Sequence, residues 1–223
     1  MIHNWKLGIK LLRYAHGIKM TLIIGIAILL LNIPVIIAGI LSDNLIMGGY
    51  MLMSVSMLPT QLLYSLSASN MVLTTAYRKK LQTSVPAALT CGNMMLMYLI
   101  SALLYGIVAL GQGKLLDNAG EQMLMIALMM DLVMAYTGIA YKYFAVATLC
   151  LCLSLPFMLT TALPATGGLG NLFGQGGFSF VSAVLIGLVM LVAGGLLQYL
   201  LSRLCYRTPL SKMAQAAPLR KEL

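Results

Sequence analysis

Asp131 is the side chain whose chemistry needs explaining first, because it is an ionisable residue near the middle of a long apolar segment. A carboxylate placed there costs about 2.5–3.5 kcal/mol and normally faces a bundle interior or a wet cavity. The surrounding leucines and methionines offset that cost. Asp131 is therefore a candidate for the wall of a translocation path; the alternative is a protonated packing residue.

Enzyme chemistry has little support among the residue types. The two histidines, His3 and His16, lie near the N-terminus, so no apolar segment offers a Ser–His or metal-binding pair. The sequence contains no GxxxxGK[ST] phosphate loop. We expect a non-catalytic chain without a metal or cofactor of its own, and any ATP and Mg would be bound by a partner chain. The four cysteines are typical of buried apolar residues: Cys91, Cys150, Cys152 and Cys205.

Composition predicts the class of protein. The 223 residues are 61% apolar and 9% charged, and the mean hydropathy is +0.95. A soluble chain of this length has no core large enough to bury such a surface. We predict an all-α polytopic membrane protein with a single transmembrane domain over residues 1–223. The net charge of +9 would favour nucleic acid in a soluble domain, but no nucleic-acid partner is expected here.

Six apolar segments are long enough to cross a hydrocarbon core, which requires ~20 residues. They cover about residues 20–41, 45–67, 87–110, 121–140, 144–163 and 178–201. With the N-terminus inside, every lysine and arginine except Lys114 falls on the inner side. Short loops obey the positive-inside rule best. The pattern predicts cytoplasmic N- and C-termini, with residues 202–223 as a cytoplasmic tail.

Residues 1–19 are predicted to form an interfacial amphipathic helix. At helical spacing its basic residues fall on one narrow stripe, with apolar residues such as Trp5 on both sides. Such helices lie in the membrane interface with their basic side chains toward anionic head groups. The alternative is a flank that only sets topology. The residues of the stripe are His3, Lys6, Lys10 and Arg13.

Residues 70–86 separate the second and third predicted spans and are expected in the cytoplasm. They contain the only consecutive charges within the hydrophobic body, Arg78 to Lys80. A solvated charge run that merely sets topology would have the same composition.

The order of these parts resembles the ABC-2 type permeases, which are membrane subunits of ATP-binding-cassette exporters. In that family the cytoplasmic segment between spans two and three forms a coupling helix that contacts the ATPase. It commonly reads as charged residues, a leucine-containing turn, a small residue and a proline. The matching residues here are consecutive: Arg78, Lys79, Lys80, Leu81, Gln82, Thr83, Ser84, Val85 and Pro86.

The resemblance implies a permease subunit in a bacterial inner membrane, paired with a second permease subunit and two ABC ATPase subunits. Its cargo would be hydrophobic or amphipathic, such as a peptide or lipid. Three other classes stay open: an ion-coupled secondary carrier that uses Asp131, a small substrate-binding subunit of a vitamin importer, and a signalling or immunity protein without transport.

Overall fold

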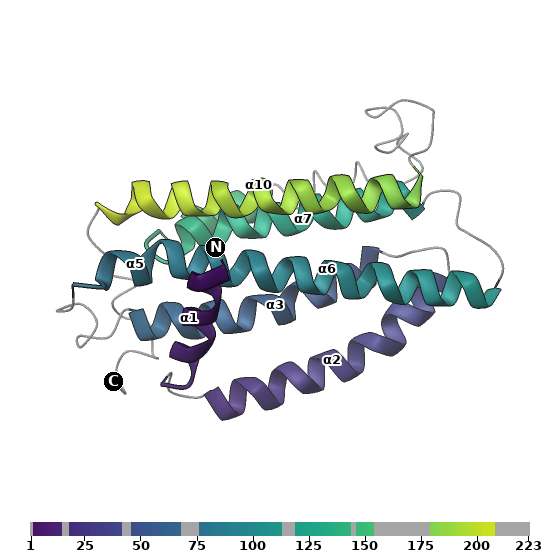
Figure 1. Cartoon of the computed structure of the whole chain (residues 1–223), viewed down its shortest axis with the longest axis horizontal. Helices are drawn as coiled ribbons and strands as arrows, with labels where there is room; N and C mark the ends of the chain where they lie inside the picture. The colour runs from purple at the N-terminus through teal and green to yellow at the C-terminus, as the bar shows by residue number, and fades with distance from the viewer. Residues whose placement is uncertain are drawn as a thin grey trace.

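The chain folds into a helical bundle, seen here in a computed structural model. The residues that the structure describes are 2–14, 18–41, 46–67, 76–112, 119–143, 146–153 and 179–207. No strand occurs in those ranges, so the all-α prediction is confirmed for them. In chain order the helices are α1 (Ile2–Leu12), α2 (Ile18–Leu41), α3 (Ile46–Ser67), α5 (Arg78–Gln82), α6 (Ser84–Gln112), α7 (Ala119–Ala140) and α10 (Phe180–Tyr206) (Figure 1). A short helix covers residues 146–153.

Four described stretches of helix are long and apolar enough to cross a membrane, which indicates a membrane protein. They are Ile18–Gly39, Arg78–Gly111, Ala119–Ala140 and Phe180–Tyr206. These stretches correspond to the first, third, fourth and sixth predicted spans.

The two other predicted spans differ. Helix α3 matches the second one in its bounds but is not among the four, and its second half carries the polar residues Thr60 and Gln61. The predicted fifth span, 144–163, is described only over 146–153. The rest of it lies outside the described residues, as do residues 70–75 and the tail after 207.

Prolines stand at three places in the long helices. Helices α2 and α3 continue through Pro34 and Pro59. Membrane helices tolerate such residues because neighbouring groups satisfy the backbone atoms that proline leaves without a partner. Pro86 lies in the first turn of α6, where its missing N–H removes no intrahelical hydrogen bond.

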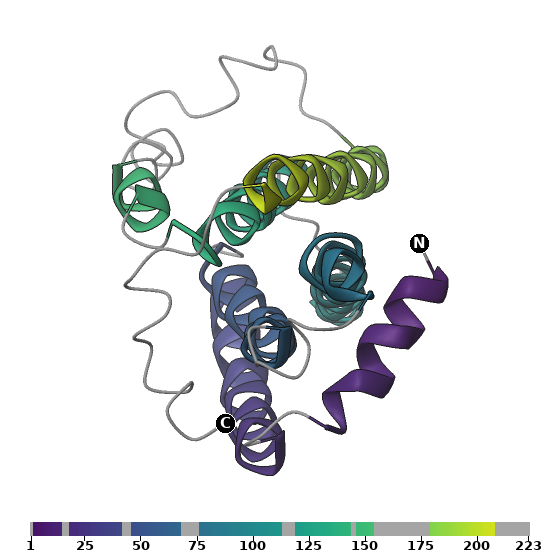
Figure 2. The ribbon, with the colours of Figure 1, turned by 90° about the vertical axis from the view of Figure 1, so that its left-hand side faces the viewer.

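Helices α7 and α10 lie side by side over most of their length, and we call them the α7–α10 pair (Figures 1 and 2). Small residues permit this approach. A Cβ atom added to Gly138 would lie 3.0 Å from the carbonyl oxygen of Gln198 and 3.2 Å from Cβ of Leu201. Close contact through small residues is the main source of van der Waals stabilisation between membrane helices.

Helices α3 and α6 form a second group, with α2 against α3 and α1 against α6. Helix α1 runs across the long helices instead of along them (Figure 1). A buried apolar core joins this group to the α7–α10 pair, and it includes Met94 of α6, Met130 of α7 and Leu191 of α10. The outer sides of α2, α6 and α10 expose large apolar side chains, among them Leu31, Leu103 and Val189.

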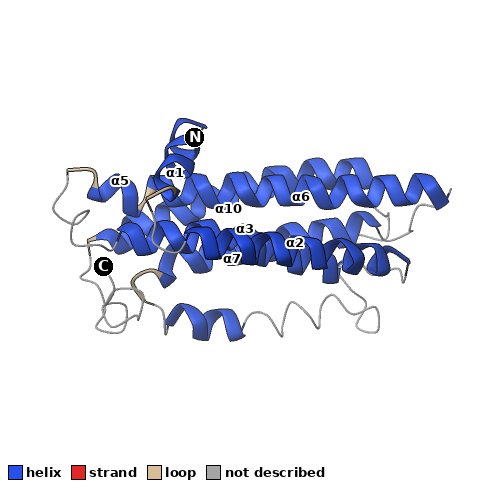
Figure 3. Cartoon of the chain, turned by 90° about the horizontal axis from the view of Figure 1, so that it is seen from below, coloured by secondary structure: helices blue, strands red, loops and turns tan. Residues whose placement is uncertain are grey.

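The two ends of the bundle differ in charge. Helix α6 begins at the end where α3, α7 and α10 finish, and α5 lies there too (Figures 1 and 3). Glu121 lies in the first turn of α7, at the opposite end. In the described part of the chain the basic residues lie on or directly after α1, in the first turn of α2, or at the α5 end: Lys6, Lys10, Arg13, Lys19, Arg78, Lys79, Lys80, Lys142, Arg203 and Arg207.

Candidate functional site

The segment predicted to couple to a partner forms a short helix followed at once by a long one. Helix α5 ends before Thr83, whose φ of −122° and ψ of −76° interrupt the helical path. The Thr83 hydroxyl donates to the Lys79 carbonyl at 2.7 Å, and the Ser84 hydroxyl donates to the Lys80 carbonyl at 3.3 Å. These bonds satisfy carbonyls that the end of α5 leaves without backbone partners. Ser84, Val85 and Pro86 form the first turn of α6, ahead of the predicted start at residue 87.

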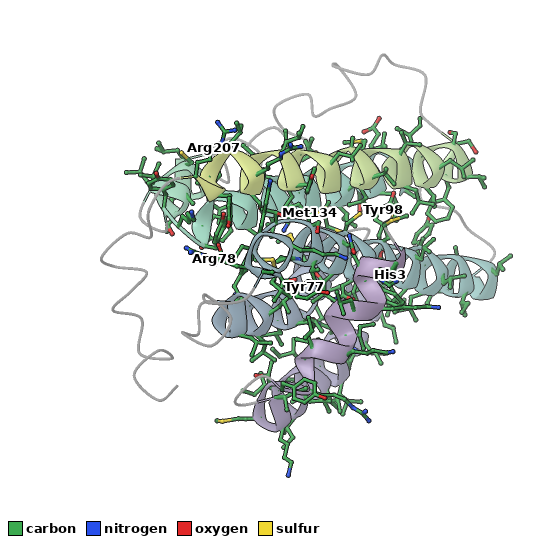
Figure 4. All side chains as sticks on the ribbon, turned by 60° about the vertical axis from the view of Figure 1, so that its left-hand side comes forward. His3, Tyr77, Arg78, Tyr98, Met134 and Arg207 are labelled. Atoms are coloured by element: carbon green, nitrogen blue, oxygen red, sulfur yellow. The ribbon has the colours of Figure 1, made fainter. Side chains whose placement is uncertain are left out.

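The structure divides the nine residues of this segment into accessible and buried ones. Lys79 is exposed, and Arg78, Lys80 and Ser84 are half-buried. Tyr77, which the sequence pattern did not single out, is 68% exposed beside them (Figure 4). A partner could therefore contact the surface of Tyr77, Arg78, Lys79 and Lys80. The other five predicted contacts are buried: Leu81, Gln82, Thr83, Val85 and Pro86.

The buried side of α5 belongs to a small apolar cluster, which we call the α5 cluster. It contains Leu63 of α3, Leu81 of α5, and Val85 and Leu89 of α6. Helix α1 covers this cluster with four half-buried side chains: Trp5, Leu7, Leu11 and Leu12. Helix α5 thus packs against α3 and α6 through the α5 cluster. Its Lys79 side chain faces outward, whereas the Nε atom of Arg78 is buried.

Helix α1 is seated on the first turns of α6. A Cβ atom added to Gly92 would lie 2.6 Å from the Trp5 ring, and the Trp5 indole N–H donates to Asn93 Oδ1 at 3.4 Å. The four side chains of the predicted basic stripe are all exposed: His3, Lys6, Lys10 and Arg13. His3 is labelled in Figure 4. Trp5 therefore contacts protein, whereas the basic stripe is directed away from the bundle.

Asp131 lies at the contact between α7 and α10. Its Oδ1 atom is buried and has no hydrogen-bond partner among the described residues. A Cβ atom added to Gly194 of α10 would collide with that oxygen and would lie 2.9 Å from Cε of Met134. The half-buried Asp131 side chain therefore packs its carboxyl group against α10. No cluster of three or more His, Cys, Asp or Glu that could hold a metal occurs in the described ranges.

A buried group of uncharged polar side chains was not predicted. The Thr60 and Thr90 hydroxyls are 2.9 Å apart, and Gln198 Nε2 donates to the Thr90 hydroxyl at 3.1 Å. The rings of Tyr64 and Tyr141 stack with centroids 5.2 Å apart. We call Thr60, Tyr64, Thr90, Tyr141 and Gln198 the polar cluster. It joins α3 and α6 to the α7–α10 pair near the α5 end.

Lys142 follows α7 at the same end and is only 2% exposed. Its ammonium group donates to the Tyr206 carbonyl at 2.7 Å and lies over the rings of Tyr141 and Tyr206. Burial lowers the pKa of Lys142, the nearby Arg78 lowers it further, and Cys205 acts in the opposite direction. Lys142 thus links the ends of α7 and α10.

No family model, curated protein or solved structure matches this chain. The fold and charge pattern define a helical membrane protein with a basic, partly exposed helix at one end. The function proposed below is argued from these features.

Proposed function

We propose that the chain is the permease subunit of an ABC transporter and that α5 contacts a separate ATPase subunit. The observation that carries this proposal is the two-sided character of α5. Lys79 is exposed and Arg78 and Lys80 are half-exposed, while Leu81 is held in the α5 cluster. A short helix that is fixed to the bundle and charged on its free side can receive force from a protein in the cytosol.

The proposed topology has six spans with both termini in the cytoplasm of a bacterium. It is supported by the described basic residues, which lie on or directly after α1, at the start of α2 or at the α5 end, and by Glu121 at the opposite end. Cytoplasmic loops carry an excess of lysine and arginine. Helix α1, which crosses the bundle and exposes its basic stripe, would lie in the inner-leaflet interface.

Movement of the ATPase would be transmitted through the α5 cluster. Leu81 contacts the same apolar cluster as Leu63 of α3 and Val85 of α6. A displacement of α5 would therefore shift the ends of α3 and α6 together. Because α6 begins directly after Thr83, no flexible linker separates the contact surface from the membrane helix.

The proposed division of labour leaves chemistry to the partner. ATP and Mg would be bound by two ATPase subunits, and a second permease subunit, identical or related, would complete the path. Asp131 places a carboxyl group at the contact between α7 and α10, with its Oδ1 atom buried. The apolar surroundings of Asp131 suit a hydrophobic or amphipathic cargo, such as a peptide or lipid, exported from the cell.

Purification from native membranes tests the ATPase contact. We expect a Walker-motif ATPase to co-purify with the unmodified chain and to be lost from the double variant Lys79→Glu/Lys80→Glu. The control is Arg203→Glu/Arg207→Glu, which reverses two exposed charges at the same end but outside α5. The proposal fails if no ATPase is bound, or if both double variants retain it equally.

An ion-coupled carrier is the second candidate, and the orphaned Oδ1 atom of Asp131 is the observation that favours it. A buried carboxyl that binds and releases a proton could drive flux without ATP. In proteoliposomes, this candidate predicts proton-driven flux that Asp131→Asn abolishes. Flux that requires the ATPase and ATP would exclude it.

A further inference from the structure

The polar cluster lies where two parts of the bundle meet, each held together by contacts of its own. One part is the α7–α10 pair, which is joined near the α5 end by its own hydrogen bonds. The Tyr141 hydroxyl donates to the Ser202 carbonyl at 3.0 Å, and Lys142 donates to the Tyr206 carbonyl. The other part is α3, α5 and α6, joined by the α5 cluster. Each part has internal contacts that do not involve the other.

The polar cluster supplies side-chain contacts between the two parts near the α5 end. Gln198 of α10 donates to Thr90 of α6, and the ring of Tyr141 stacks on that of Tyr64 of α3 at an interplanar angle of 4°. Thr60, Thr90 and Gln198 are fully buried. These three side chains are therefore inaccessible to water in the arrangement seen here.

The chemistry of the polar cluster suits a contact that opens and closes. Hydrogen bonds are directional and weaken steeply with small displacements. Gln198 Oε1 is buried and accepts no hydrogen bond from the described residues. In the closed arrangement the buried oxygen without a hydrogen bond costs free energy. Water that enters an opened cluster would donate a hydrogen bond to it and remove that cost.

The cluster is also connected to α5 through the first two turns of α6. Thr90 lies in the second turn of α6, and its hydroxyl contacts the Pro86 carbonyl at 2.9 Å as well as Thr60. A displacement of α5 reaches Thr90 through two turns of continuous helix. We propose that the polar cluster is a cytoplasmic gate, which opens when α3 and α6 separate from the α7–α10 pair.

Cys91 is a native reporter of this gate. Its side chain is fully buried next to Thr90, and its thiol contacts the Leu191 carbonyl of α10 at 3.4 Å. The parent chain for the test replaces the other three cysteines with alanine. A membrane-impermeant methanethiosulfonate reagent is then applied to the cytoplasmic face of inside-out vesicles.

We expect Cys91 to react slowly in the parent and at least tenfold faster after Gln198→Leu or Thr90→Val. Each of these variants removes one hydrogen bond between α10 and α6. The matched control is Gln61→Leu, which makes the same change at an exposed position of α3 next to Thr60. It should leave the rate for Cys91 at the parent value.

General loosening of the bundle is detected by a second reporter. Ala119→Cys, in a chain without native cysteines, places a thiol at a buried position at the far end of the bundle. Under the gate proposal it stays unreactive in the Gln198→Leu chain. The proposal is overturned if Cys91 reacts at the parent rate in both cluster variants, or if Ala119→Cys becomes reactive to the same degree.

This inference takes two points from the proposed function: that the α5 end of the bundle faces the cytosol, and that the ATPase causes the gate to open. The labelling itself needs no ATPase and no cargo. Failure to find an ATPase would therefore defeat the proposed function while leaving the reactivity of Cys91 to decide the gate. Faster reaction of Cys91 only from the opposite face would contradict the gate alone.

Discussion

The α5 region and the centre of the α7–α10 pair place charged and apolar side chains in opposite ways. Helix α5 exposes Lys79 and buries its apolar side chain Leu81 in the α5 cluster. The α7–α10 pair holds the carboxyl of Asp131 inward, while α10 turns apolar side chains such as Val189 outward. The first arrangement suits contact with a protein in water, and the second suits burial in lipid. We therefore expect the two regions to respond differently to substitution.

The largest expected effect lies in the α7–α10 pair, at Gly194. The variant Gly194→Val places carbon atoms where the Asp131 carboxyl and Met134 now lie. Overpacking of this kind costs about 3 kcal/mol, so we expect a large fall in the unfolding temperature in detergent. Gly106→Val on α6 is the control, because a Cβ added there would meet open space among the described residues. Equal loss of stability in both variants would show that the close contact at Gly194 is not what matters.

A smaller effect is expected at α5, from Leu81→Ala. Leucine-to-alanine changes at buried sites cost about 2 kcal/mol or more, and here the loss should fall on the attachment of α5. We expect faster proteolysis near residue 78 and weaker co-purification of the ATPase. Leu103→Ala removes the same atoms from a side chain that is 64% exposed on α6, and it should change neither measurement. A loss of ATPase in the Leu103→Ala chain as well would argue against a specific role for the α5 cluster.

The smallest effect on stability is expected at Asp131 itself. Asp131→Asn removes a charge but keeps the shape of a side chain whose Oδ1 has no described partner. We expect the unfolding free energy to change by less than about 1 kcal/mol, because no hydrogen bond to Oδ1 is lost. Glu121→Gln is the control at the end of α7. A large loss of stability in Asp131→Asn alone would assign Asp131 a structural partner.

Much of the fold was accessible from the sequence because hydropathy and charge act locally. Apolar runs predicted the long helices. The spacing of Lys6 and Lys10 predicted a basic stripe toward lipid head groups, which stays a prediction, and both side chains are exposed. The buried side of α5 was harder to foresee, since only the three-dimensional structure brings α1 and Leu63 against Leu81. Tyr77 carries no motif and was missed for that reason.

The polar cluster could not be predicted from the sequence, and the physical reason is a different one. Its members are uncharged and come from four separate stretches of the sequence, and the Thr90 hydroxyl also donates locally to the Pro86 carbonyl. Nothing in their spacing distinguishes them from ordinary polar residues of membrane helices. Likewise, the contact of Asp131 with Gly194 depends on how α7 and α10 align, which no local pattern specifies.

Photo-crosslinking from residue 79 in native membranes tests the central claim most directly. A photoreactive amino acid replaces Lys79, the exposed residue of α5, and the crosslinked products are identified by mass spectrometry. The account predicts one dominant product that contains a Walker-motif ATPase, and none from the same probe at Leu103. Products that contain only lipid, or labelling of residue 79 by an impermeant reagent added outside intact cells, would contradict it.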